Sequence, residues 1–139
     1  MLVSLVELLA DAEHRKYAVG HFNVYNLETI QAVIEGGAAA HSPVIVAISE
    51  KTLFYAGEEA IVQLARFFST RTSVPVAIHL DHGHTPALVE RALAWGFTSV
   101  QLDVSGMRAD RQVKIMSDLV YKAQARGISV EGERDVMPH

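Results

Sequence analysis

The sequence contains no cysteine, few aromatic residues and no block of like charges. The absence of cysteine excludes disulfide bonds, thiol catalysis and cysteine-ligated metal clusters. The net charge is −4 and no basic stripe is present, so no nucleic-acid partner is expected. No apolar run approaches the roughly 20 residues of a membrane span, so no membrane partner is expected either. The apolar N-terminal residues lack the leading Lys or Arg of a secretory signal, which makes a cytoplasmic location the default expectation.

Half of the 139 residues are hydrophobic and 20% are charged. This composition is typical of a folded globular chain rather than a disordered one. The length suits one domain, and no linker divides the chain, so residues 1–139 are expected to form a single domain. Short β-rich runs alternate with segments of helical periodicity throughout. This alternation is typical of an α/β protein with a parallel sheet.

The pattern predicts five helices and five strands. Apolar residues recur at helical spacing in the helices, and an unbroken apolar run is typical of a strand that is buried on both faces. Ser4 followed by Glu7 predicts a capping box, and Gly127 follows the last helix as a C-terminal glycine. The expected helices cover 4–13, 27–40, 57–69, 85–95 and 107–126, and the expected strands cover 18–24, 44–48, 75–80, 97–103 and 128–131.

Two parallel architectures fit this alternation. A doubly wound sheet that binds a dinucleotide needs a glycine-rich turn after its first strand, but the chain has no GxGxxG or Walker-type loop. A (βα) barrel places its chemistry at the C-terminal ends of its strands. With a period of two, every strand ends in a polar or acidic side chain on one face. Such residues are also common in loops and helix caps, but the repeated pattern favours a barrel whose mouth is ringed by Asn23, Ser49, Asp81, Asp103 and Glu131.

The densest group of chemically active side chains is His79-Leu-Asp-His-Gly-His84. Neutral imidazole is a common ligand for zinc and similar ions. Asp81 and His82 point to opposite faces if the strand continues, so we expect different roles for them. His82 would turn into the mouth as a metal ligand, Asp81 would transfer protons, and Gly83 would allow the backbone to turn. His79, one pleat deeper, is expected to be an interior histidine held by a hydrogen bond.

Taken in order, these motifs resemble the N-terminal half of the class II, zinc-dependent ketose-bisphosphate aldolases. The resemblance runs from about Leu2 to Glu133. The segments that carry it are Tyr17-Ala-Val-Gly-His-Phe-Asn-Val24, Ser42-Pro-Val-Ile45, Tyr55-Ala-Gly57, Val74-Pro-Val-Ala-Ile-His-Leu-Asp-His-Gly83, Gly96-Phe-Thr-Ser-Val100 and Gly127-Ile-Ser-Val-Glu-Gly-Glu133.

The resemblance implies a partial TIM barrel and a lyase of carbohydrate metabolism. Such an enzyme cleaves fructose- or tagatose-bisphosphate into dihydroxyacetone phosphate and glyceraldehyde phosphate. The implied cofactor is Zn²⁺, and the implied partner is a phosphorylated sugar substrate. By resemblance, Asp81 exchanges a proton with the substrate hydroxyl and His82 is a zinc ligand. The resemblance also implies that Asp103 and Glu133 are acidic residues near the metal, with alternative or second-metal roles, and that Asn23 and Ser49 line the substrate pocket.

The chain also departs from the family pattern. Ser105-Gly-Met-Arg108 stands where the family has a Ser-His-Leu-Pro motif. The other two zinc histidines and the phosphate-binding loops belong to the family's C-terminal half, so the zinc site of these residues is expected to be incomplete. Five strands, where a closed barrel has eight, would leave two open edges, so a homo-oligomer or a rearranged, flatter sheet is expected. The alternative hypothesis is a truncated, non-catalytic α/β module of the same family that oligomerises or binds metal.

Overall fold

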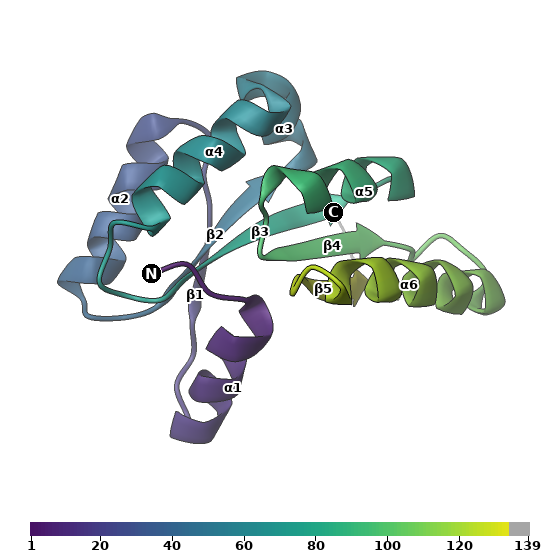
Figure 1. Ribbon diagram of the computed structural model, residues 1–139, viewed down its shortest axis with the longest axis horizontal. Helices are drawn as coiled ribbons and strands as arrows, with labels where there is room; N and C mark the ends of the chain where they lie inside the picture. Colours follow the sequence, from purple (N-terminus) through teal and green to yellow (C-terminus); the bar gives the residue numbers. More distant parts are fainter. Residues whose placement is uncertain (134–139) are drawn as a thin grey trace.

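The structure, a computed structural model, describes residues 1–133; residues 134–139 lie outside the description. Figure 1 shows a parallel sheet flanked by helices, as the sequence predicts. The elements in chain order are α1 (Leu5–Arg15), β1 (Gly20–Asn23), α2 (Leu27–Ala39), β2 (Val44–Ser49), α3 (Glu50–Ala56), α4 (Glu58–Ser69), β3 (Val76–Gly83), α5 (Pro86–Trp95), β4 (Ser99–Asp103), α6 (Ala109–Gln124) and β5 (Ser129–Glu133).

The five strands are all parallel and lie in the order β1-β2-β3-β4-β5. Each strand pairs with the next one along the chain, and at least one helix connects each pair. A closed TIM barrel continues this arrangement to eight strands. Within the described residues the fold is therefore a partial barrel, with β1 and β5 as its two edges.

The main hydrophobic core lies between the sheet and helices α2 to α6. Alternate strand residues such as Val46, Ile78 and Val100 are fully buried on this face. They pack against helix residues such as Ile30 and Val89. Because side chains alternate along a strand, the intervening residues face the opposite side of the sheet, which is the interior of the partial barrel.

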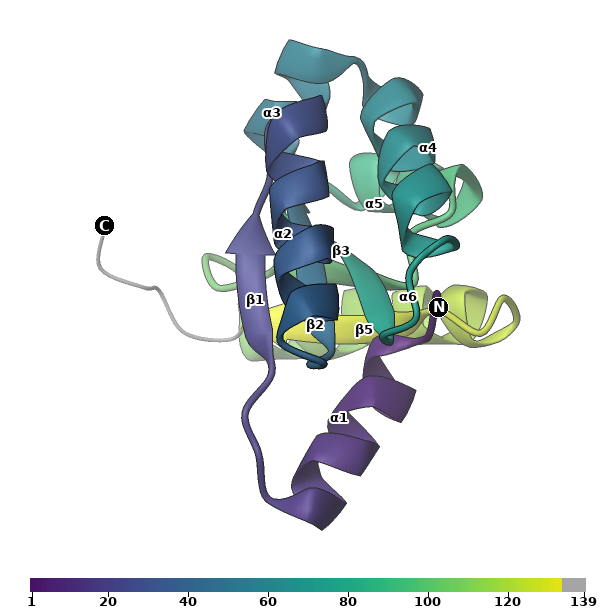
Figure 2. The ribbon, with the colours of Figure 1, turned by 90° about the vertical axis from the view of Figure 1, so that its left-hand side faces the viewer.

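Helix α1 covers the N-terminal end of that interior face. Leu5 and Leu8 of α1 form a second buried cluster with Ile45 of β2 and Ala77 of β3. Figures 1 and 2 both place α1 apart from the other helices. The N-cap half of the predicted capping box is present, since the Ser4 hydroxyl accepts a hydrogen bond from the Glu7 backbone N–H. The apolar side of α1 thus closes the floor of the partial barrel and leaves its C-terminal mouth open.

One helix was not predicted, and several predicted boundaries differ from the structure. Helix α3 was not predicted, because its seven residues are too few for a helical period and Phe54 and Tyr55 are exposed. Strand β3 was predicted to end at Leu80, but it continues to Gly83. Helix α6 begins at Ala109 rather than at residue 107.

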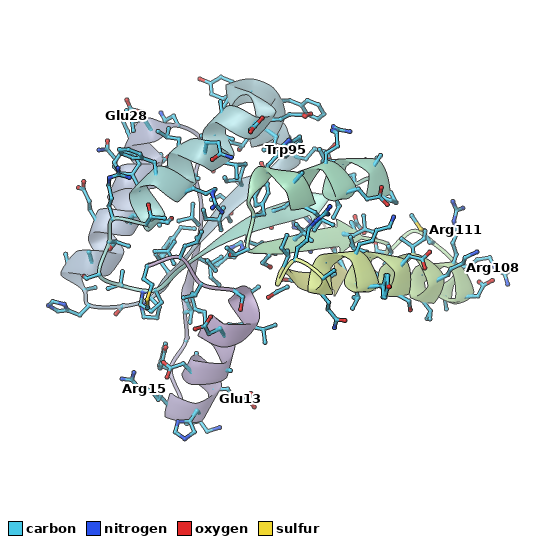
Figure 3. The ribbon with its side chains drawn as sticks, viewed as in Figure 1. Glu13, Arg15, Glu28, Trp95, Arg108 and Arg111 are labelled. Atoms are coloured by element: carbon cyan, nitrogen blue, oxygen red, sulfur yellow. The ribbon has the colours of Figure 1, made fainter. Side chains whose placement is uncertain are left out.

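Charged side chains occupy the outer surfaces of the helices. Figure 3 labels Glu28 on α2 and the two arginines Arg108 and Arg111 at the start of α6, all directed away from the sheet. No helix within residues 1–133 combines the length and the apolar character that crossing a membrane requires.

Candidate active site

The strand register gathers the predicted polar side chains at the mouth of the partial barrel. Ser49 of β2 pairs with Asp81 of β3, and Asp103 of β4 pairs with Glu133 of β5. Asn23, the last residue of β1, pairs with Ala47. These residues stand at the C-terminal ends of their strands, where parallel barrels carry their chemistry.

A bulge in β3 shapes the centre of the mouth. Leu80 pairs with Val100, but the next pairing joins Gly83 to Leu102, so β3 contains one extra residue there. His82 adopts a left-handed backbone conformation with φ 53°. The prediction that Gly83 makes this turn is therefore wrong. Gly83 instead permits close packing, because a Cβ atom there would lie 2.6 Å from a Val89 methyl carbon and 2.8 Å from the Gln101 carbonyl oxygen.

The bulge brings His82 to the same side as its acidic neighbours. His82 Nδ1 lies 3.1 Å from Glu133 Oε2, and Nε2 lies 3.8 Å from Asp81 Oδ1. Asp81 and His82 would point to opposite faces only in a regular strand, and the bulge interrupts that regularity, so His82 turns toward the mouth as expected. The His82 side chain is about half exposed. An imidazole and a carboxylate at this separation offer two metal-binding atoms that are open to a ligand.

Gln101 holds this arrangement and was not among the predicted site residues. Its side-chain oxygen accepts a 2.9 Å hydrogen bond from the His82 backbone N–H, and its amide nitrogen donates to Glu133 Oε2 at 3.1 Å. Gln101 is buried. The sequence could have pointed to Gln101, because it places an amide side chain on the interior face of a predicted strand. Polar groups that are buried there are held in hydrogen-bond networks.

Asp81 and Asn23 meet across the intervening strand. Asn23 Nδ2 donates a 2.8 Å hydrogen bond to Asp81 Oδ2. Between them β2 contributes Ala47 and Ser49, and these small side chains leave room for the contact. Asn23 thereby fixes the orientation of one carboxylate oxygen, while Oδ1 faces His82.

Asp103 and Ser49 are engaged in local structure. Asp103 Oδ1 accepts hydrogen bonds from the Ser105 backbone N–H at 2.9 Å and from the Ser105 hydroxyl at 2.7 Å. These bonds lower the pKa of the Asp103 carboxyl below its usual value, and His84 and His82 contribute further. Ser49 caps α3 by accepting a hydrogen bond from the Thr52 backbone N–H. The roles predicted for Asp103 at the metal and for Ser49 at the substrate stay predictions.

His79 is a buried interior histidine, as expected. It is 1% exposed, and its Nδ1 shares a 2.8 Å hydrogen bond with the Ser99 hydroxyl. Burial is the main cause that lowers the pKa of His79 to about 4, with repulsion from His21 next. The ring is therefore neutral at pH 7.

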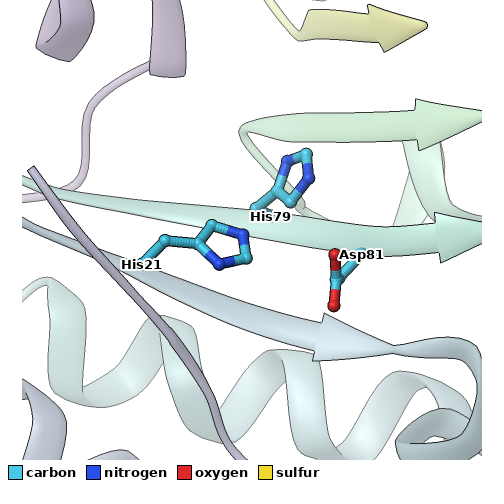
Figure 4. A group of neighbouring side chains, drawn as sticks. All are labelled: His21, His79 and Asp81. Carbon is cyan, nitrogen blue, oxygen red and sulfur yellow. The ribbon is translucent and has the colours of Figure 1, made fainter. Parts of the chain in front are cut away.

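His21 was not among the predicted site residues, although it alternates with Asn23 on the interior face. Its ring packs edge-on against the ring of His79, with 5.5 Å between the centroids. Figure 4 shows His21 beside His79, with Asp81 further along β3. Within residues 1–133, these three are the one group of three His, Asp or Glu residues whose ligand atoms all lie within 4.8 Å of one another.

The fold and the mouth define a class of protein: a parallel (βα) barrel segment with an imidazole and carboxylates at the strand ends. The sequence profile of class-II fructose-bisphosphate aldolase matches residues 3–138. The chain belongs to this family. It is 41% identical over 139 residues to a fructose-bisphosphate aldolase of Geobacillus stearothermophilus, covering 98% of this chain and 48% of that protein. It is 40% identical over 135 residues to one of Staphylococcus epidermidis, covering 95% of this chain and 47% of that protein.

A solved structure agrees with the fold. The YdjI aldolase from Escherichia coli K12 superposes with a TM-score of 0.90 at 28% identity, covering 99% of this chain and 54% of that chain. The chain spans about half the length of the curated relatives that it matches. Its similarity therefore concerns the segment that carries β1 to β5.

Proposed function

We propose that this chain provides the proton-transfer and first metal-binding elements of a metal-dependent aldolase. Its substrate would be a ketose bisphosphate, such as fructose- or tagatose-bisphosphate, which is cleaved into two triose phosphates. The observation that supports this most is the meeting of Asp81, His82 and Glu133 at the β3 bulge. Relatives named fructose-bisphosphate aldolase support the substrate class.

The donor set at the bulge suits Zn²⁺, which binds imidazole nitrogen and carboxylate oxygen. His82 and Glu133 would hold the ion, with Asp103 next to Glu133 in the strand register. A bound divalent cation supplies Lewis-acid stabilisation of negative charge that develops on substrate oxygens. Because His82 and Glu133 supply only two ligands, further coordination positions on the ion would be open to other groups.

Asp81 is the proposed proton acceptor for the substrate hydroxyl. Its carboxylate lies at the mouth and is partly exposed, so a substrate can reach it. The hydrogen bond from Asn23 holds Oδ2, which leaves Oδ1 directed toward the His82 side. A general base must lie within about 2.6–3.2 Å of the proton that it takes. Fixing the carboxylate by a neighbouring amide favours that geometry.

Self-association is a further part of the proposal. Strands β1 and β5 end the sheet, and open edges with an uncovered interior face favour pairing with another chain. A homo-oligomer would bring ligands of several copies together. Light scattering coupled to size exclusion tests this, and a strictly monomeric mass would contradict it. The proposed chemistry on sugar phosphates accords with the cytoplasmic location expected from the sequence.

The test is aldol cleavage of fructose bisphosphate and of tagatose bisphosphate by residues 1–139, with added Zn²⁺ and with a chelator. Asp81→Asn keeps the size of the side chain and removes the base, and we expect about a 10²–10⁴-fold loss. Asp118→Asn, on the exposed side of α6, is the matched control and should retain activity. Absence of cleavage by folded protein would contradict activity of this chain. That result would favour the alternative, a non-catalytic module. The observation that supports this alternative is that Asp103 and Ser49 are engaged in local hydrogen bonds.

A further inference from the structure

A second group of ligands lies deeper in the partial barrel than the His82–Glu133 pair. His21 of β1, His79 of β3 and Asp81 of β3 each offer one ligand atom, and these atoms lie within 4.8 Å of one another. Figure 4 shows the three side chains on the interior face. Two imidazoles and one carboxylate are a donor set for Zn²⁺, Co²⁺, Ni²⁺ and Cu²⁺ rather than for Mg²⁺ or Ca²⁺.

The distances suit one ion after a small adjustment. Metal–ligand bonds of roughly 2.0–2.2 Å place two ligands of one ion at most about 4.0–4.4 Å apart. His21 is exposed and can rotate, so a displacement of roughly 1 Å brings the set within range. His79 and Asp81 stand on the same strand two residues apart, hence on the same face. The ligand separation is therefore set mainly by the approach of His21 from β1.

Neighbouring side chains already orient two of the three ligands. The hydrogen bond between His79 Nδ1 and the Ser99 hydroxyl leaves Nε2 for a metal ion when Nδ1 carries the proton. Metal-binding histidines commonly donate their second ring N–H in this way. Asn23 donates to Asp81 Oδ2 and so orients the carboxylate. Glu131 Oε2, which lies 3.7 Å from His79 Nε2, adds negative charge beside the group.

We propose that His21, His79 and Asp81 form a binding site for a divalent transition-metal ion that is separate from the His82–Glu133 pair. The ion that this site would bind is a divalent transition-metal ion such as Zn²⁺ or Co²⁺. The site uses three side chains and leaves the remaining coordination positions to water. Asp81 is also the proton acceptor of the proposed reaction. An ion held here would oppose that reaction, a consequence that rests on the proposed function.

The test measures binding directly and requires no cleavage. Residues 1–139 are stripped with a chelator and titrated with Co²⁺, whose visible absorption reports coordination, and bound Co²⁺ is then displaced by Zn²⁺. His21→Ala removes a ligand of the proposed site without touching His82. We expect it to weaken Co²⁺ binding at the proposed site by about tenfold or more, since the loss even of an outer partner costs about 10- to 100-fold. His82→Ala and the surface control His14→Ala should leave that site unchanged.

A second readout identifies the ligand atoms. Long-range ¹H–¹⁵N spectra of the histidine rings should show Zn²⁺ shifting the Nε2 resonance of His79 together with a ring nitrogen of His21. Circular dichroism and thermal unfolding establish that each variant is folded. The proposal is overturned if the wild-type chain binds no Co²⁺, if His21→Ala binds as tightly as wild type, or if His82→Ala abolishes the same site. Failure of aldol cleavage with intact Co²⁺ binding would contradict the proposed function alone.

Discussion

His82 Nε2 lies 3.8 Å from Asp81 Oδ1, although the two residues are consecutive in β3. Adjacent residues of a regular strand point to opposite faces. Here the extra residue between Leu80 and Gly83, with His82 at φ 53°, turns both side chains toward the mouth. The bulge is therefore the local feature that assembles the proposed site.

The left-handed backbone conformation of His82 predicts that two substitutions at this position differ in their effect on stability. His82→Asn and His82→Val both remove the imidazole and its contact with Glu133. Asn tolerates positive φ, whereas a β-branched residue does not. We expect His82→Val to be less stable than His82→Asn by about 1–2 kcal/mol, measured by urea unfolding. Equal stabilities would mean that the bulge does not require this backbone conformation.

The bond between Asn23 and Asp81 predicts a graded loss of stability. Asn23→Ala removes the 2.8 Å hydrogen bond and should cost about 0.5–1.5 kcal/mol. Asn23→Asp places a second carboxylate against Asp81 and should cost more at pH 7. Because salt screens charge repulsion, the difference in unfolding free energy between Asn23→Ala and Asn23→Asp should narrow in high salt. A gap that does not respond to salt would contradict an electrostatic origin.

Much of the fold could be predicted from the sequence because each signal was local. The alternation of helical and strand periods gave the five strands, and the period of two placed Asn23, Asp81 and Asp103 on one face. The bulge could not be predicted, because an extra residue in β3 is defined only by pairing with β4. The contact between His21 and His79 likewise depends on strands that are not neighbours in the sheet.

Two adjacent glycines of α2 provide a matched pair for packing. A Cβ at Gly37 would lie 2.8 Å from Val44 Cγ1 and 3.1 Å from the Ser42 carbonyl oxygen, whereas a Cβ at Gly36 would meet nothing within 4 Å. Gly36→Ala should stabilise the chain by about 0.5–1 kcal/mol, because alanine favours the helix. Gly37→Ala should destabilise it, because β2 must move away from α2. Thermal unfolding of the two variants checks this, and a stabilising Gly37→Ala would contradict the close approach.

The depressed pKa of His79 predicts how stability depends on pH in the metal-free chain. An imidazole in the unfolded chain takes up a proton near pH 6.5, whereas the buried His79 does so only near pH 4. Between these values the unfolded state binds more protons, so stability rises with pH. At about 1.4 kcal/mol for each pH unit, acidification from pH 6.5 to pH 4 should cost on the order of 3 kcal/mol through this residue.

The measurement is urea unfolding from pH 7 to pH 4 in the presence of a chelator, for wild type and His79→Gln. Glutamine does not titrate, so the variant should lose stability less steeply as the pH falls, even if it is less stable at pH 7. His14→Gln, which changes an exposed histidine of α1, should keep the wild-type slope. If His79→Gln also keeps that slope, then the buried ring is not the group that resists protonation.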